Sequence, residues 1–332
     1  MTQDRPLLEV NDLHVGFPIR KGFFQRTVGE VRAVSGVSFS IPRGTSFGLV
    51  GESGCGKTTV ARAVLQLVEP SGGSIRFDGE DVAQMDAVAL RRFRGRVQPV
   101  FQDPFSSLNP RMSTGRILSE PLRVHRLKPE SEIKAEVARL LDICGLPARF
   151  ADLYPHEMSG GQRQRVGIAR ALAMNPELIV CDEAVSALDV SIQAQIINLL
   201  EGLQKELGLT YLFIGHDLSV VRHICDQVAV MYLGRIAETA PSDPLFANPR
   251  HPYTQALIDA VPNPDPDYEA GREIVPLEGE VPSPANPPSG CFFHPRCPRA
   301  TDHCRREVPR LDPVEPGHMA ACWETGAPAP AG

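Results

Sequence analysis

A short glycine-rich segment is the feature of this sequence most clearly built for chemistry. Residues 51–58 fit the pattern G-x-x-x-x-G-K-[ST], and we call them the phosphate loop. In this pattern the glycines leave backbone N–H groups open to phosphate oxygens, the lysine reaches the outer phosphates, and the last hydroxyl binds Mg²⁺. The segment therefore predicts a nucleotide site. Its candidate ligands are Gly51, Ser53, Gly54, Cys55, Gly56, Lys57, Thr58 and Thr59.

The residues on either side of the phosphate loop have the composition that such a loop requires. Residues 46–50 are a short apolar run that predicts a strand, and residues 58–65 have a helical sequence. A strand, a glycine loop and a helix in this order point the positive end of the helix dipole at bound phosphate. An ordinary glycine-rich turn is the alternative, and it leaves the strand and the helix unexplained.

Two adjacent carboxylates close an apolar run later in the chain. Residues 178–181 are apolar, and Asp182 and Glu183 follow them. If the run is a strand of a parallel sheet, both carboxylates emerge at its carboxyl edge, where α/β proteins bind ligands. Asp182 then suits Mg²⁺, and Glu183 can polarise the water that attacks the terminal phosphate. Taken alone, the pair is explained equally well as a solvated turn.

A second glycine-containing segment precedes a predicted helix over residues 163–172. Ser159 fits the N-cap position, and the glycines after it leave bare N–H groups at the positive end of the helix. Such a helix tip can bind phosphate, although a capped helix with no ligand is the simpler reading of four residues alone. The segment is Ser159, Gly160, Gly161 and Gln162.

Composition and charge exclude several classes of protein. The chain has 332 residues, 42% of them hydrophobic, which suits one large domain with an appendage or two domains. A net charge of −6 disfavours a nucleic-acid coat or a polybasic membrane anchor. No apolar run approaches the roughly 18–20 residues that span a bilayer, and residues 1–6 lack the apolar stretch of a secretory signal. We therefore expect a cytosolic protein.

Several segments together resemble one family. Residues 154–166 resemble the signature of ATP-binding cassette (ABC) ATPases, and residues 181–189 resemble their Mg²⁺-binding strand and D-loop. Residues 101–110 are similar to their Q-loop. Residues 251–254 and 282–288 resemble the C-terminal extension found in the ATPase subunits of dipeptide and oligopeptide ABC importers. The resemblance covers residues 7–323 in the family's order.

The resemblance implies a role for each matching residue. Gln102, Glu183 and His216 would be catalytic, with Gln102 also linking the nucleotide to a membrane partner. Phe17 falls where the family stacks an aromatic ring on adenine, although a phenylalanine in the core of a strand explains it about as well. The implied Mg²⁺ ligands are Thr58, Gln102 and Asp182. The residues implied to meet the other subunit are Ser159, Gly160, Gly161 and Gln162, with Ser186 and Asp189 in the D-loop.

The same resemblance implies the fold and its division into domains. We expect an α/β P-loop NTPase of the ABC type, with a RecA-like parallel-sheet core, an antiparallel β subdomain and a helical subdomain. Residues 1–102 and 176–245 would form the ATP-binding core with the β subdomain, and residues 103–175 the helical signature subdomain. Residues 246–332 would be a small irregular extension. Beyond residue 261, proline is frequent enough to exclude long helices.

The implied function is ATP hydrolysis that drives a membrane importer. ATP would be held in a head-to-tail dimer of the chain with itself or with a paralogous ATPase. Two transmembrane permease subunits and an extracytoplasmic binding protein would complete the importer, at the cytoplasmic face of the inner membrane. Dipeptides or oligopeptides are the implied cargo, with nickel or another small solute as an alternative. A soluble ABC ATPase acting on DNA or ribosomes is the alternative of a different class.

Four of the eight cysteines cluster near the C-terminus, and their spacing matches no C-x-x-C pattern. Four thiolates can hold Zn²⁺ or a [4Fe–4S] cluster, and four unrelated thiols are the remaining possibility. Peptide-importer ATPases can carry a [4Fe–4S] cluster on such a set, so the resemblance favours the cluster over zinc. We expect it to cross-link a tail with little core of its own. The cysteines are Cys291, Cys297, Cys304 and Cys322.

Overall fold

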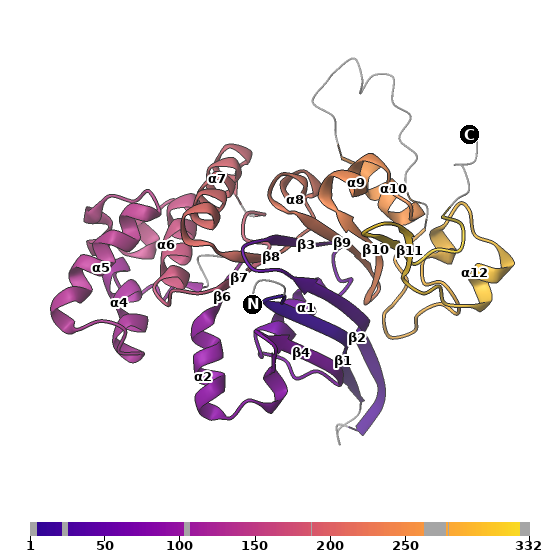
Figure 1. Ribbon diagram of the computed structural model, residues 1–332, viewed down its shortest axis with the longest axis horizontal. Coiled ribbons are helices and arrows are strands. Elements are labelled where there is room, and N and C mark those ends of the chain that lie inside the picture. The colour runs from indigo at the N-terminus through magenta and orange to yellow at the C-terminus, as the bar shows by residue number, and fades with distance from the viewer. Residues whose placement is uncertain are drawn as a thin grey trace, which may run out of the picture. The chain divides into compact units, whose positions relative to one another are not determined.

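The computed structural model describes residues 5–21, 26–102, 107–186, 188–261, 277 and 279–325 (Figure 1). The chain forms two compact units, each built from several stretches of sequence. The first unit takes Met1–Leu8, Ile41–Ser46 and Arg76–Ile214. The second takes Glu9–Ser40, Phe47–Ile75 and Gly215–Gly332.

Parallel strands form the base of the first unit. They are β6 (Val97–Val100), β7 (Leu178–Asp182) and β8 (Thr210–Gly215), paired in the order β6-β7-β8. Residues 178–181 and 210–214 are buried, as expected where helices cover both faces of a parallel sheet. β7 confirms the strand considered for residues 178–181.

The helices of the first unit occupy the stretch that the sequence predicts to be mainly helical. Three of them pack on one another and form one group in Figure 1: α4 (Thr114–Val124), α5 (Glu130–Ile143) and α6 (Gly160–Leu172). The buried side chains of α5 recur every three or four residues, which is the spacing of an amphipathic helix. Residues 103–106, at the start of that stretch, lie outside the described residues. The other elements of the unit are β5 (Glu80–Asp81), α2 (Ala87–Arg96), α7 (Val190–Leu207) and the 3₁₀ turns η1 (Val82–Gln84), η2 (Ala148–Asp152) and η3 (Pro155–Glu157).

A mixed sheet carries the second unit. Its strand order is β11 (Asp312–Glu315), β12 (His318–Ala320), β10 (Arg235–Pro241), β9 (Gln227–Tyr232) and β3 (Ser46–Val50). β3 and β9 are parallel, and β9 and β10 form an antiparallel hairpin. β12 extends the sheet by pairing antiparallel with β10, so the proline-rich tail is tied to the sheet by backbone hydrogen bonds.

A second group of strands in this unit has the order β2 (Arg26–Ile41), β1 (Leu8–Lys21), β4 (Gly72–Phe77). β1 is one long strand although it contains the polar residues Asn11 and Asp12. The reason lies at Asp12, which adopts a left-handed φ of 46° and donates its N–H to Ser38 Oγ at 2.8 Å. The polar pair Asn11-Asp12 is thus an irregularity within the strand and not a break between two strands.

The remaining helices of the second unit are short. They are α1 (Lys57–Val64), α8 (Leu218–Ile224), α9 (Ser242–Ala247), α10 (Pro252–Asp259), the 3₁₀ turn η4 (His294–Arg296) and α12 (Asp302–Arg306). The described part of the tail therefore has only short elements, as its proline content predicts. Among the residues that the structure describes, no helix combines the length and the apolar character needed to cross a membrane.

Candidate active site

The phosphate loop connects β3 to α1, as predicted. Gly51 has a φ of 148°, and a Cβ there would lie 2.1 Å from the backbone oxygen of Met231. Gly56 has a φ of 107°, and a Cβ there would lie 2.2 Å from the backbone oxygen of Ala33. Glycine is required at both positions because the loop passes directly against neighbouring backbone. Gly54, in contrast, is exposed and has open space around it.

Lys57 begins α1 and is 4% exposed. Its Nζ donates hydrogen bonds to the backbone oxygens of Gly51 at 2.7 Å and Glu52 at 2.9 Å. The ammonium group is therefore held inside the curve of the loop, where a phosphate ligand needs a cation. Cys55 Sγ lies 3.7 Å from Nζ, and burial raises the pKa of this thiol despite the nearby ammonium.

The hydroxyl side chains of the phosphate loop and of the start of α1 differ in exposure. Ser53 is exposed, and Thr58 and Thr59 are half-buried on the first turn of α1. His216 is also exposed in this unit, just before Asp217, which caps α8 by accepting the N–H groups of Ser219 and Val220. A helix cap therefore orients the chain that presents the histidine.

Phe17 lies on β1 with 41% of its surface exposed. The interpretation of Phe17 as a strand-core residue is therefore wrong. An exposed ring on a strand can stack on a flat ligand, and adenine stacking stays a prediction.

In the first unit, three predicted residues meet at the carboxyl ends of β6 and β7. Gln102 Nε2 donates to Glu183 Oε2 at 2.7 Å and lies 3.3 Å from Ser186 Oγ. Ser186 Oγ in turn donates to the backbone oxygen of Glu183 at 3.0 Å. The cluster joins the predicted Q-loop, the predicted water-polarising carboxylate and the predicted D-loop.

The backbone at this cluster is held in an uncommon conformation. Glu183 has a left-handed φ of 50°, and its N–H donates to Ile214 O at 2.8 Å. Such a conformation costs on the order of 1–3 kcal/mol and is found where a side chain must be aimed. Asp182, one residue earlier, ends β7 and is half-buried, a position from which a carboxylate can bind Mg²⁺.

Asp189 occupies the N-cap position of α7 and is exposed. Its backbone oxygen accepts the N–H groups of Ile192 at 2.9 Å and Gln193 at 2.8 Å. Its side chain makes no cap hydrogen bond. The carboxylate thus stands at the surface, as the predicted D-loop role at a subunit contact requires. Ala187, within this predicted loop, lies outside the described residues.

Ser159 caps α6, as predicted, through a reciprocal pair of hydrogen bonds. Its Oγ accepts the N–H of Gln162 at 3.3 Å, and Gln162 Oε1 accepts the N–H of Ser159 at 2.9 Å. Ser159 is exposed, whereas Gly161 is buried, and a Cβ at Gly161 would lie 2.5 Å from Ile192 Cγ2 of α7. Gly161 therefore allows close helix packing, and the helix tip faces outward.

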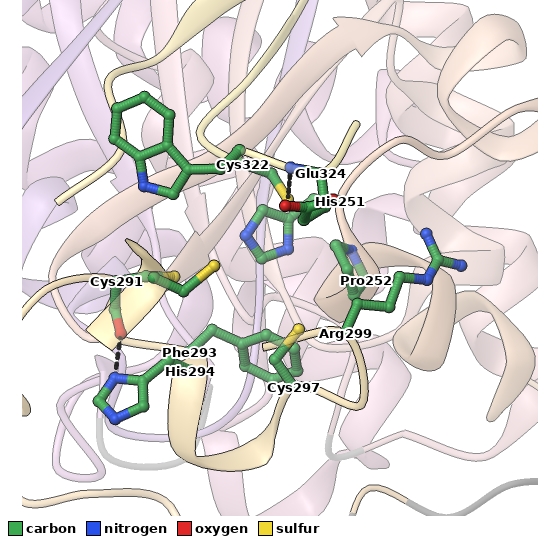
Figure 2. Close-up of a pocket in the computed structure, with 11 residues that line it drawn as sticks. His251, Pro252, Cys291, Phe293, His294, Cys297, Arg299, Cys322 and Glu324 are labelled. Atoms are coloured by element: carbon green, nitrogen blue, oxygen red, sulfur yellow. Dashed lines mark hydrogen bonds between the residues drawn. The ribbon is translucent and has the colours of Figure 1, made fainter. Parts of the chain in front are cut away.

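The four clustered cysteines line one pocket in the second unit, with His251, Phe293 and Trp323 among its other walls. Figure 2 shows Cys291, Cys297 and Cys322 on different sides of this pocket. Burial raises the pKa of the Cys291 and Cys297 thiols, and it raises the pKa of Cys322 to about 12. Over the described part of the chain, no group of three or more His, Cys, Asp or Glu side chains is arranged to hold a metal ion.

Sequence reasoning missed the contacts that tie the phosphate loop to the C-terminal extension. Glu52, inside the loop, is bound by Arg296 and by Tyr253. Tyr253 belongs to the predicted segment 251–254, but its partner lies 201 residues away. A charged residue at the second loop position was the only available signal, because no local pattern reveals a partner so distant in sequence.

Comparisons with known proteins agree with this geometry. The chain matches the family described as "ABC transporter" over residues 34–186 and the family described as "Oligopeptide/dipeptide transporter, C-terminal region" over residues 237–304. It is 54% identical to the oligopeptide transport ATP-binding protein AppF of Bacillus subtilis, covering 95% of this chain and 96% of that protein. It is also 54% identical to a probable peptide ABC transporter ATP-binding protein, y4tS, of Sinorhizobium fredii, covering 98% and 91%.

Two solved structures share the fold. CbiO1 from Clostridium perfringens, described as part of the ABC transporter complex CbiONQ, has a TM-score of 0.64 and 30% identity, covering 74% of this chain and 92% of that one. The ATP-binding cassette MJ0796, solved as a dimer bound to ADP and phosphate after hydrolysis, has a TM-score of 0.62 and 26% identity, covering 71% and 98%. Both similarities support the predicted P-loop NTPase fold of the ABC type.

Proposed function

The chain belongs to the ATP-binding proteins of oligopeptide/dipeptide ABC transporters, and from this premise we propose that it holds ATP between two subunits. It is the ATPase that supplies energy for peptide import. In the proposed head-to-tail dimer, the phosphate loop of one subunit faces the tip of α6 in the other. The partner is a second copy or a paralogous ATPase.

The observation that carries this proposal is the exposed, capped tip of α6. Ser159 and the N–H groups that follow it can donate hydrogen bonds to the terminal phosphate of a nucleotide held by another subunit, because a helix N-terminus favours an anion. A bivalent site makes ATP a reversible link, since it binds the closed dimer better than the open one. Asp189, exposed at the start of α7, would lie at the contact between subunits.

On the phosphate-loop side we assign each residue a part. Lys57 binds the outer phosphates, and Thr58, Gln102 and Asp182 would hold Mg²⁺, which neutralises charge on the phosphates. Glu183 orients the water and accepts its proton. The exposed His216 would contact the terminal phosphate, and Phe17 would stack on adenine. The chain's residues thus supply positioning and charge, which is most of what phosphoryl transfer needs.

We propose that the domains follow the division read from the sequence. The core takes residues 1–102 and 176–245, the helical subdomain residues 103–175, and the extension residues 246–332. Gln102 ends the first core segment and is placed to report the state of the nucleotide to the helical subdomain. Two transmembrane permease subunits would receive that signal at the cytoplasmic face of the inner membrane. A binding protein on the other side would deliver short peptides.

Co-purification from detergent-solubilised membranes tests the partner. The expected result is a complex with two permease subunits that retains ATPase activity. Capture of ribosomes or DNA, with no membrane protein, would favour a soluble ABC ATPase instead. Uptake of labelled peptide by cells carrying Lys57→Ala should fall to background, because the variant no longer binds ATP. Uptake of nickel or another small solute, with no peptide uptake, would change the assigned cargo.

Although the described side chains are not arranged to hold a metal ion in the structure, we propose further that the four clustered cysteines hold a [4Fe–4S] cluster after their thiols reorient within the pocket. All four line one pocket, and a set of sulfur ligands suits iron–sulfur or zinc chemistry. Burial raises the pKa of the Cys291, Cys297 and Cys322 thiols, so binding a metal must release protons from them. Bound there, a cluster would cross-link segments from residue 291 to residue 322, and zinc is the alternative with the same structural role.

Anaerobic purification distinguishes these possibilities. A cluster gives brown protein with visible absorbance that disappears in Cys297→Ser. Cys225→Ser is the control, because this buried thiol does not line the pocket. Colourless protein with one zinc per chain would show that the cysteines bind zinc and not a cluster. Colourless protein without metal would show that they form no metal site.

A further inference from the structure

The C-terminal extension holds the phosphate loop through an ion pair between two residues that are far apart in sequence. Arg296 Nη1 and Nη2 donate to Glu52 Oε2 at 2.7 Å and Oε1 at 3.1 Å, across 244 residues. The Arg296 side chain is 6% exposed and that of Glu52 is 27% exposed. Two parallel charge-assisted hydrogen bonds fix direction as well as distance, and each is roughly twice as strong as a neutral one.

Every polar group of Glu52 is engaged. Its N–H donates to Tyr253 Oη at 2.9 Å, and its backbone oxygen accepts Lys57 Nζ at 2.9 Å. Its carboxylate binds Arg296. Residue 52 therefore links the loop lysine, which must meet phosphate, to two side chains of the extension.

Arg296 lies beside a cluster of three aromatic rings, of which Tyr253 and Phe293 belong to the extension. The rings of Tyr232, Tyr253 and Phe293 contact one another pairwise, with centroids 4.7 to 5.4 Å apart. The Arg296 guanidinium lies over the Tyr232 ring at 5.9 Å. Phe293 immediately precedes η4, which ends at Arg296. Such packing leaves the guanidinium little freedom to leave Glu52.

We propose that Arg296 is a positioning residue for ATP binding, which acts through Glu52, together with Tyr253, to hold the phosphate loop in the shape that receives ATP. The proposal rests on the assignment of the phosphate loop as the ATP site. It gives the extension a part in the ATPase cycle of its own subunit. Cys297 follows Arg296 directly, so the cysteine pocket and the loop clamp share one short element.

Steady-state kinetics on the full chain tests the clamp. In Arg296→Gln and in Glu52→Gln, the KM for MgATP should rise about tenfold, the loss expected from one strong hydrogen bond. The kcat should stay within about twofold, because the reacting groups are untouched. The double variant should be no worse than the poorer single variant, since both changes remove one interaction. Arg296→Lys keeps the charge but not the fork, and should be intermediate.

Arg306→Gln is the matched control, because this exposed arginine of α12 is paired with Asp302 at 3.9 Å on the surface. It should keep the wild-type KM. Glu52→Gln carries the test if Arg296→Gln fails to fold. An unchanged KM in the folded variants, with only a lower unfolding temperature, would reduce the pair to a structural role and overturn the proposal. If Lys57→Ala binds ATP normally, the fault lies in the assignment of the loop and not in the clamp.

Discussion

Gln102 Nε2 donates a hydrogen bond of 2.7 Å to Glu183 Oε2, joining residues that closely follow the carboxyl ends of the neighbouring parallel strands β6 and β7. The amide is thereby attached to the carboxylate expected to polarise water. Any change that moves Gln102 must alter the position of that carboxylate or break the bond. A signal between a nucleotide and a membrane partner needs such a connection, because coupling requires an element whose two states both sites affect.

Glu183→Gln should keep ATP binding and abolish turnover. Glutamine has nearly the same shape, but it cannot accept the proton of the attacking water. We expect kcat to fall at least about 100-fold, the usual effect of losing a general base. An ATP-bound dimer should then accumulate, measured by size-exclusion chromatography alongside phosphate release. Glu206→Gln, an exposed change on α7, is the control. Normal hydrolysis in Glu183→Gln would remove this residue from the proposed role.

Ser159→Asp separates the cap of α6 from its proposed contact with phosphate. Aspartate is as good an N-cap as serine and complements the helix dipole, so the free energy of unfolding should change by less than about 1 kcal/mol. Its negative charge should repel the triphosphate of the other subunit and prevent the ATP-dependent dimer. Ser159→Asn, a cap without charge, should dimerise more readily than Ser159→Asp. Wild-type dimerisation of the aspartate variant would contradict the two-subunit site.

The sequence predicted those parts of the site that are local. The phosphate loop follows the predicted strand and precedes the predicted helix, because a short run of residues determines each of them. The capping box of Ser159 and Gln162 is local in the same sense.

The clamp on Glu52 could not be predicted, because its partners come from segments 201 and 244 residues away. Only the folded chain brings Tyr253 and Arg296 to the loop. Likewise, the polarity of Asp12 does not reveal that this left-handed residue continues a strand. Pairing over long distances is a property of tertiary packing and leaves no periodic signal.

Acid should weaken an ion-pair network that fixes the starts of β6 and β7. Arg96 donates to Asp78 Oδ2 at 2.7 Å and to Glu177 Oε2 at 3.0 Å. Hydrogen bonds with Arg96 lower the pKa of both carboxylates from 3.8 and 4.5. As the pH decreases below those values, the unfolded chain binds more protons than the folded one. The free energy of unfolding therefore decreases until the pH has passed the lowered pKa values of the folded state.

The unfolding temperature should therefore drop between about pH 5 and about pH 3. Because the groups are partly exposed, each pair should contribute about 1 kcal/mol or less. Glu177→Gln should lower stability at neutral pH and reduce the drop in unfolding temperature between neutral and acid pH. Thermal unfolding at a series of pH values measures both effects. Glu206→Gln should keep the wild-type slope. If the unfolding temperature of Glu177→Gln drops as steeply in acid as that of the wild type, other groups cause the acid sensitivity.

Two glycines of the phosphate loop should respond differently to alanine. Both have positive φ, which costs an L-residue roughly 1–2 kcal/mol. At Gly54 nothing lies within 4 Å of the added methyl group, so Gly54→Ala should lose only that amount and still fold. At Gly51 the methyl group would lie 2.1 Å from Met231 O, which belongs to the backbone of β9. Gly51→Ala must displace that strand or the loop, and should lose about 3 kcal/mol or more. Urea unfolding gives both values, and equal losses would show that the loop moves away from β9 without cost.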